Sequence, residues 1–111
     1  EYHNNLAVAL MNASDYSGAR ASLECALALD AAYPRALANM AVCCFHLYRF
    51  RESYHYYRLA READARYALE RFERARVLAR IEDLSRKDPG NESLRKIASY
   101  LRAMPPERPA Q

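Results

Sequence analysis

Asn5-Leu6-Ala7-Val8 returns further along the chain as Asn39-Met40-Ala41-Val42, and this 34-residue repetition decides the fold. The same spacing relates further pairs of similar residues: Tyr16/Phe50, Ala19/Ser53, Leu23/Tyr57, Ala26/Ala60, Asp30/Asp64 and Tyr33/Tyr67. A period of this length is typical of arrays of helical hairpins, in which each hairpin completes the core of its neighbour. The sequence therefore predicts an all-α solenoid of tandem antiparallel hairpins, a fold that usually binds another protein.

The strict repeat ends after Tyr67, because another step of the same length would place Arg71 and Arg74 where Leu37 and Met40 stand. We therefore expect repeat one at residues 1–33, repeat two at 34–65, and capping helices at 66–87 and 91–103. These elements form a single domain over residues 1–104. Residues 105–111 are expected to be a disordered tail, and the whole chain a fragment of a longer protein.

Helix boundaries follow from capping residues. The first helix is expected over residues 2–13, and Ser14-Asp15 supplies a capping side chain for a second helix that runs to about Leu29. Pro34 suits the first turn of a third helix, which ends near Tyr48, and a fourth helix is expected over residues 50–63. Apolar and small residues at helical spacing predict the inner faces of these helices, namely Leu6/Ala7/Leu10, Leu37/Met40/Ala41/Cys44 and Ser53/Tyr57/Ala60.

The apolar stripe of the helix expected at 66–87 changes sides midway. Ala68, Phe72, Ala75 and Ala79 share one face, and Val77, Ile81 and Leu84 share nearly the opposite one. We expect the first half to cap the repeats. The second half is expected to be covered by a stripe of the last helix: Leu94, Ile97, Ala98 and Leu101.

Composition narrows the class of protein. The 111 residues include only two glycines, which suits a helical chain, and no apolar run is long enough for a membrane helix. Cys25, Cys43 and Cys44 lack zinc-ligand spacing, so we interpret them as free thiols in a reducing compartment, most simply as small core residues of a cytoplasmic protein.

The residues quoted above resemble the tetratricopeptide repeat family, whose units are antiparallel helix pairs of about 34 residues. The resemblance covers residues 1–65, although His3 and Leu37 stand where the family often has a large residue, and Ala31 and Ala65 replace its usual closing proline. It implies a non-catalytic interaction module or scaffold that grips an extended peptide or a helix on a concave surface lined by the first helix of each pair.

A helical wheel assigns residues to that groove. Asn5, Val8 and Asn12 lie opposite the expected core face of the first helix, and Asn39, Val42 and His46 lie opposite that of the third. Asparagine amides can bond a peptide backbone, and valines offer apolar contact. Met11 and Phe45 are expected to edge the groove. As an alternative, the same residues are ordinary polar positions facing solvent.

Within the family, some members resemble a carboxylate clamp for the acidic C-terminal tails of chaperones. Asn5 fits the clamp's asparagine, and Arg35 stands where the clamp uses a lysine. Asn39, however, stands where the clamp uses an arginine, so the pattern is incomplete and chaperone-tail binding is a lesser alternative.

Enzymatic activity finds no support in the sequence. His3, His46 and His55 fall on three different expected helices, and no phosphate loop, metal motif or paired-cysteine motif occurs. We therefore predict no catalytic residue, cofactor, metal or small-molecule substrate. A regulatory or targeting role within a larger multidomain enzyme stays open.

The sequence also bears on two further kinds of partner, nucleic acid and a second copy of the chain. The arginine-rich stretch from Arg49 to Arg80 could meet nucleic acid, but Glu62/Arg66 and Glu70/Arg74 can pair along a solvated helix face, which makes this interpretation less favoured. Homo-oligomers are possible through an open N-terminal edge at Leu6 and Leu10, if that edge lacks an upstream neighbour.

Overall fold

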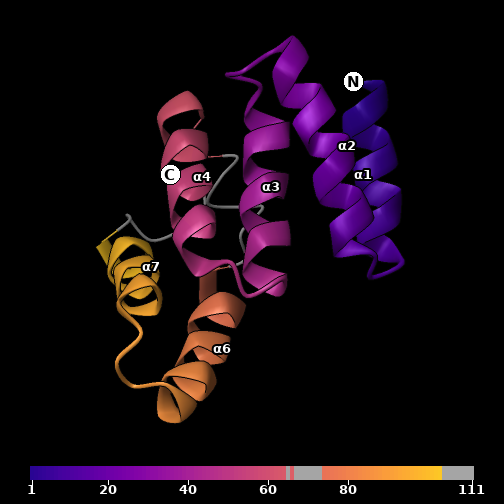
Figure 1. Cartoon of the computed structure of the whole chain (residues 1–111). Helices are drawn as coiled ribbons and strands as arrows, with labels where there is room; N and C mark the ends of the chain where they lie inside the picture. Colours follow the sequence, from indigo (N-terminus) through magenta and orange to yellow (C-terminus); the bar gives the residue numbers. More distant parts are fainter. Residues whose placement is uncertain (65, 67–73, 104–111) are drawn as a thin grey trace, which may run out of the picture.

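The computed structural model describes residues 1–64, 66 and 74–103, and its regular structure there is entirely helical (Figure 1). The helices are α1 (Tyr2–Asn12), α2 (Tyr16–Leu29), α3 (Pro34–His46), α4 (Phe50–Ala63), α6 (Arg74–Lys87) and α7 (Glu92–Ala103). Consecutive helices form hairpins, and α1, α2, α3 and α4 follow one another across the molecule. The prediction of an all-α fold of tandem hairpins is confirmed.

Local chemistry sets the helix ends as expected. The Asp15 carboxylate accepts a hydrogen bond from the Gly18 backbone N–H at 3.0 Å and so caps α2. Pro34 occupies the first turn of α3, where its missing N–H costs no helical hydrogen bond. Asn91 plays the capping role for α7 by accepting a bond from the Leu94 N–H at 3.1 Å.

The sequence repeat is visible in the backbone of the hairpin turns. Ser14 and Tyr48, which occupy equivalent repeat positions, both have positive φ angles, of 62° and 64°. The residue after each turn donates the same backbone bond of 2.8 Å, from Asp15 to Leu10 and from Arg49 to Cys44. Both hairpins therefore close with the same turn.

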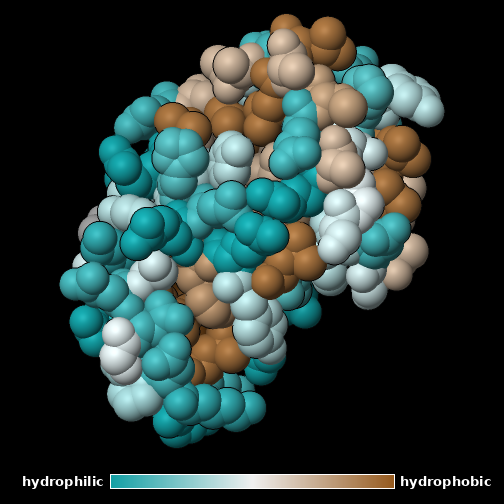
Figure 2. Space-filling view, viewed as in Figure 1, coloured by the Kyte–Doolittle hydropathy of each residue, from teal (hydrophilic) through white to brown (hydrophobic). Residues whose placement is uncertain are grey.

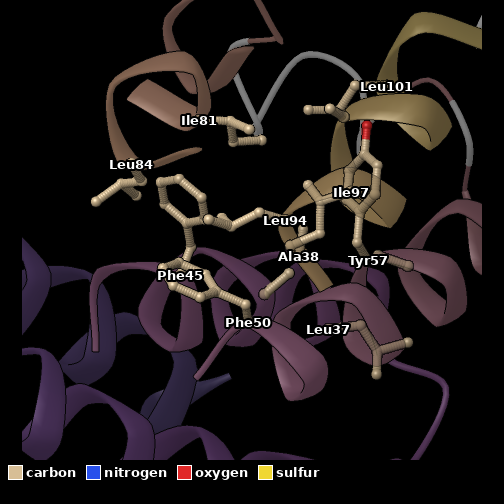
Figure 3. Packing of buried hydrophobic residues seen from close by; sticks show 13 residues of the cluster. Leu37, Ala38, Phe45, Phe50, Tyr57, Ile81, Leu84, Leu94, Ile97 and Leu101 are labelled. Atoms are coloured by element: carbon tan, nitrogen blue, oxygen red, sulfur yellow. The ribbon is translucent and has the colours of Figure 1, made fainter. Parts of the chain in front are cut away.

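Helix α3 separates two hydrophobic clusters. One, the first-hairpin cluster, contains residues of α1, α2 and one face of α3: Ala7, Met11, Ala19, Leu23, Ala26, Ala36, Met40, Cys43 and Cys44. The other, the second-hairpin cluster, joins the opposite face of α3 to α4, α6 and α7: Leu37, Ala38, Ala41, Phe45, Phe50, Tyr57, Ala60, Ile81, Leu84, Leu94, Ile97, Ala98 and Leu101. In Figure 3 the labelled side chains of α6 and α7 converge on Phe45, Phe50 and Tyr57.

The expected inner residues of α3 and α4 are buried, whereas two of the three expected on α1 are not. Ala7 is fully buried, but Leu6 is 39% exposed and Leu10 is only partly buried. Asn4 and Met11 take their places on the covered side of α1. The reason is that a helix in the middle of a solenoid has two apolar faces, and the wheel combined them into one.

The two C-terminal helices pack together as their stripes predicted. Ile81 and Leu84 of α6 are buried in one cluster with Leu94, Ile97, Ala98 and Leu101 of α7. Helix α7 also packs on α4, where the Tyr100 ring meets Tyr54 and Tyr57 edge to face. Ala68 and Phe72, and the predicted continuity of one helix over 66–87, lie outside the described residues, as do residues 105–111. Ala75 and Ala79, from the same predicted face, are exposed.

Leu23→Ala tests the core of the first hairpin. Leu23 is fully buried, so the truncation removes apolar contacts and leaves a cavity, and we expect the free energy of unfolding to fall by about 3 kcal/mol in urea titrations. Leu29→Ala is the matched control: this leucine is 77% exposed, and its loss is expected to cost less than about 0.5 kcal/mol. Equal losses would contradict the assigned packing.

Candidate binding surface

Burial leaves helix α3 with a narrow accessible face. Nine of its 13 residues are buried, and the others are Pro34 and the line formed by Arg35, Val42 and His46. On α1 the repeat positions of Val42 and His46 are held by Val8, which is partly buried, and Asn12, which is exposed. We call Val8, Asn12, Arg35, Val42 and His46 the first-helix strip.

Six of the residues predicted for the groove are at least partly accessible: Asn5, Val8, Asn12, Arg35, Val42 and His46. The structure corrects the placement of the other three. Met11 is only 7% exposed and packs in the first-hairpin cluster, and Phe45 is 6% exposed in the second-hairpin cluster. Both face inward because these positions lie on the side of α1 and α3 that meets the partner helix of the hairpin.

Asn39 is the third correction. It is 1% exposed, and its Nδ2 donates a hydrogen bond of 3.0 Å to Oδ1 of Asn4, which is itself 3% exposed. A buried amide must be hydrogen-bonded to offset the loss of water. The pair therefore links the first helices of the two hairpins. Of the repeated asparagines Asn5 and Asn39, only Asn5 is presented to solvent.

The strip ends at an aromatic and basic cluster. The His46 ring stacks on Tyr16, with ring centroids 4.3 Å apart and planes at 11°. Burial lowers the pKa of His46, and Arg80 and Arg76 of α6 lower it further by charge repulsion. The imidazole is therefore neutral at pH 7. Arg80 also donates from Nη2 to the Tyr48 hydroxyl at 3.0 Å, which places α6 beside this end of the strip.

Sequence reasoning missed three residues at this surface, namely Asn4, Tyr16 and Arg80. Asn4 directly precedes Asn5, and an asparagine lying next to one of a repeated pair is the only available hint of a bond between repeats. Tyr16 was visible as a repeat position but not as a stacking partner. Nothing local to Arg80 indicates its contact with Tyr48, because 32 residues separate the two.

A polar cluster joins the second helices of the hairpins. Arg20 of α2 donates from Nη2 to the Glu52 carboxylate of α4 at 3.1 Å, and Arg49 approaches the same carboxylate at 3.3 Å. The Cys44 thiol of α3 lies beside them, and burial, followed by the charge of Glu52, raises the pKa of Cys44 to about 11. Cys44 is therefore a neutral thiol at pH 7.

The three cysteines are free thiols, as predicted, but only two belong to the core. Cys43 and Cys44 are fully buried, whereas Cys25 is exposed on α2. The expectation that all three are core residues was therefore wrong for Cys25. This position faces away from α1 and α3 in the described fold.

The residues of the carboxylate-clamp hypothesis do not converge as free ligands. Asn5 and Arg35 are exposed on α1 and α3, but the Asn39 amide is buried against Asn4. Binding of acidic chaperone tails stays a prediction that rests on the first two residues alone.

Two arginines of the predicted basic stretch lie against the protein's own aromatic rings. The Arg61 guanidinium lies 4.9 Å from the centroid of Tyr100, and Arg58 lies 5.8 Å from that of Tyr54. Such cation–π contacts hold the side chains along α4. The predicted pair Glu70/Arg74 falls partly outside the described residues. Nucleic-acid binding stays a prediction.

His3, His46 and His55 lie on α1, α3 and α4, as expected. Across residues 1–64, 66 and 74–103, no group of three or more histidine, cysteine or acidic side chains could hold a metal ion. Within the same ranges, none of the helices combines the length and the apolar character needed to cross a bilayer.

Comparison with known proteins identifies the family of the hairpin array. The profile of a family described as the coatomer epsilon subunit matches residues 2–64, which span α1 to α4. The chain belongs to the coatomer epsilon subunit family. A search of curated proteins found no match to the chain. The matched segment contains the first-helix strip, the Asn4–Asn39 bond and both hairpin turns.

Membership of the coatomer epsilon family agrees with the predicted helical-repeat architecture, because this family is built from tetratricopeptide-like repeats. A coatomer epsilon subunit is a non-catalytic component of the COPI coat that binds proteins. The family match ends before α6 and α7, so it describes the repeats and not the C-terminal helices.

Asn39→Ala tests the buried amide pair. The change leaves the Asn4 amide without its partner, so we expect the free energy of unfolding to fall by about 1–3 kcal/mol. The double variant Asn4→Ala/Asn39→Ala should lose less than the sum of the two single variants, because the single changes break the same bond. Asn5→Ala, at the exposed neighbouring position, is the control and should cost less than about 0.5 kcal/mol in the same urea titration. Additive losses would argue against the pair.

Thiol labelling tests the burial of the cysteines. At pH 8 a disulfide reagent should modify one thiol rapidly in the native protein and three after unfolding, because the thiolate is the reacting form and Cys44 has a pKa of about 11. Cys25→Ser should remove the rapid phase, and Cys44→Ser should leave it intact. Rapid modification of two or more native thiols would contradict this placement.

Proposed function

We propose that this chain is a protein-binding subunit of a cytosolic vesicle coat, and that it holds an extended segment or helix of another coat protein along the first-helix strip. Support comes from the family match over both hairpins and from the narrow accessible face of α3. The proposed mechanism is recognition, without a chemical step.

The single observation that carries the proposal is the repetition of the strip's chemistry on α1 and α3. Val8 and Val42 occupy the same repeat position, and so do Asn12 and His46, while the residues around them on α3 are buried. Helices α1 and α3 contact each other, so the two short rows are neighbours. A ligand lying along the strip would therefore meet an apolar residue and then a polar residue on each of the two helices.

The dimensions and charges of the strip define the segment that it suits. From Arg35 to His46 the helix rises by about 16 Å, which matches roughly five residues of extended chain. Arg35 stands at one end of α3, and Arg80 lies near His46 at the other. We therefore expect a short segment with apolar residues in its middle and side-chain or backbone acceptors towards its ends.

Asn12→Glu/His46→Glu tests this assignment. Both side chains reach solvent, so the fold should persist without the His46–Tyr16 stack, while the new carboxylates would repel an acceptor-bearing segment. Titration calorimetry against the purified remaining subunits of coatomer should show affinity weakened at least about tenfold, which corresponds to about 1.4 kcal/mol.

The matched control is Ala21→Glu/Ala28→Glu, which introduces the same two charges on the exposed face of α2. This variant should bind as the unmodified chain does. If both double variants bind equally well, the strip is not the contact surface. If the unmodified chain binds none of the coat subunits, the coat role itself is wrong.

A further inference from the structure

Helix α1 carries an apolar face that the described structure covers only at Leu10, which packs partly against the first-hairpin cluster. Tyr2 is 71% exposed, Leu6 is 39% exposed, Ala9 is exposed and Leu10 is only partly buried. We call these four residues the α1 outer face. Figure 2 shows hydrophobic surface along the edge of the molecule that α1 forms.

The repeat assigns a role to this face. The 34-residue repeat relates the four residues of the α1 outer face to four residues of α3: Ala36, Met40, Cys43 and Cys44. All four are at most 1% exposed, and all belong to the first-hairpin cluster, where they pack with Ala19, Leu23 and Ala26 of α2. In α3 these positions are thus the surface that docks on the preceding hairpin.

The remaining buried apolar residues of α3 form a second face, and the repeat relates this face to a different set of α1 residues. Leu37, Ala38, Ala41 and Phe45 belong to the second-hairpin cluster, and the same repeat relates them to His3, Asn4, Ala7 and Met11 of α1. Of these, Asn4, Ala7 and Met11 are buried in α1 as well. The face of α1 that packs on α2, within the same hairpin, is therefore filled. The α1 outer face, which corresponds to the side of α3 that packs on the preceding hairpin, is largely open.

A polar residue, asparagine, also occupies equivalent positions in α1 and α3. Asn39 occupies the repeat position of Asn5, and its amide donates to Asn4 on the first helix of the preceding hairpin. Asn5 is exposed on α1. A hairpin that docked in the same way would place a side-chain acceptor opposite the Asn5 amide.

A second copy of this chain does not offer the complementary surface. The side of the first hairpin that receives a first helix is already covered by α3, and α7 packs on α4 of the second hairpin. The occupant must therefore bring a hairpin of its own with that side uncovered.

We propose that the α1 outer face docks a partner helical hairpin of the same repeat type, whose second helix presents apolar residues and whose first helix presents a side-chain oxygen to Asn5. This surface is distinct from the first-helix strip, so the inference does not depend on the proposed coat function. The four matched positions and the Asn4–Asn39 bond carry it together.

The test supplies such a hairpin as a tandem copy of residues 1–34 fused before Glu1 of the full chain, which preserves the repeat register. The reporter is Leu6→Cys in a background where Cys25 and its copy are serine. Fusion should slow labelling of the reporter thiol by iodoacetamide at least tenfold and add helical circular dichroism. A reporter at Ala21→Cys, on the exposed face of α2, should label at the same rate in both proteins.

The amide contact has its own readout. Asn5→Ala should leave the urea midpoint of the unfused chain unchanged and lower that of the fused chain, and an Asn4→Leu change in the added copy should abolish this difference. Equal labelling of Leu6→Cys with and without the copy would overturn the proposal, as would an added copy that gains no helical signal. Sedimentation of the unfused chain as a dimer, with Leu6→Cys already protected, would also overturn it by assigning the face to a second copy.

Discussion

The burial of helix α3 on two opposite faces is the constraint on which the rest of the structure depends. One face completes the first-hairpin cluster with α1 and α2, and the other completes the second-hairpin cluster with α4, α6 and α7. Most of the helix is buried, and over half of its buried side chains are alanine or cysteine. Small side chains at Ala36, Ala38 and Ala41 allow neighbouring helices to approach closely, as repeat packing requires.

Polar contacts fix how neighbouring helices are aligned along their axes. Apolar packing alone specifies this alignment less sharply, because it is less directional. The Asn4–Asn39 bond ties the first helices, the Arg20–Glu52 pair ties the second helices, and the Ser53 hydroxyl donates to the Ala41 carbonyl inside the second hairpin at 2.8 Å. Each contact joins different helices, so sliding one helix along another would leave a polar group without its partner. For the two buried contacts that loss is the more costly, because water cannot replace the missing partner.

The same burial shapes the surface that is open to partners. Because α3 is covered on both sides, its accessible residues form a single line, and the binding proposed at this surface would depend on a few side chains rather than on a broad face. Helix α1 differs because, within the described part of the chain, one of its two apolar faces is largely uncovered. The two proposed surfaces therefore differ in kind, since one would hold a segment along the first-helix strip and the other would hold a further hairpin that continues the stack.

The sequence by itself determined the period, the boundaries of the first four helices, the N-cap Asp15, the first-turn residue Pro34, and the pairing of α6 with α7, since each follows from local spacing and local chemistry. It also brought Val8, Asn12, Val42 and His46 together as equivalent positions. Only the tertiary structure decided which apolar face of α1 is covered and that Asn39 is buried rather than presented to a ligand. The physical reason is that burial depends on a neighbouring helix: Leu6 and Met40 have the same spacing and similar chemistry, but α2 covers only Met40. The partner of Asn39 lies 35 residues away on another helix, where no helical periodicity can indicate it.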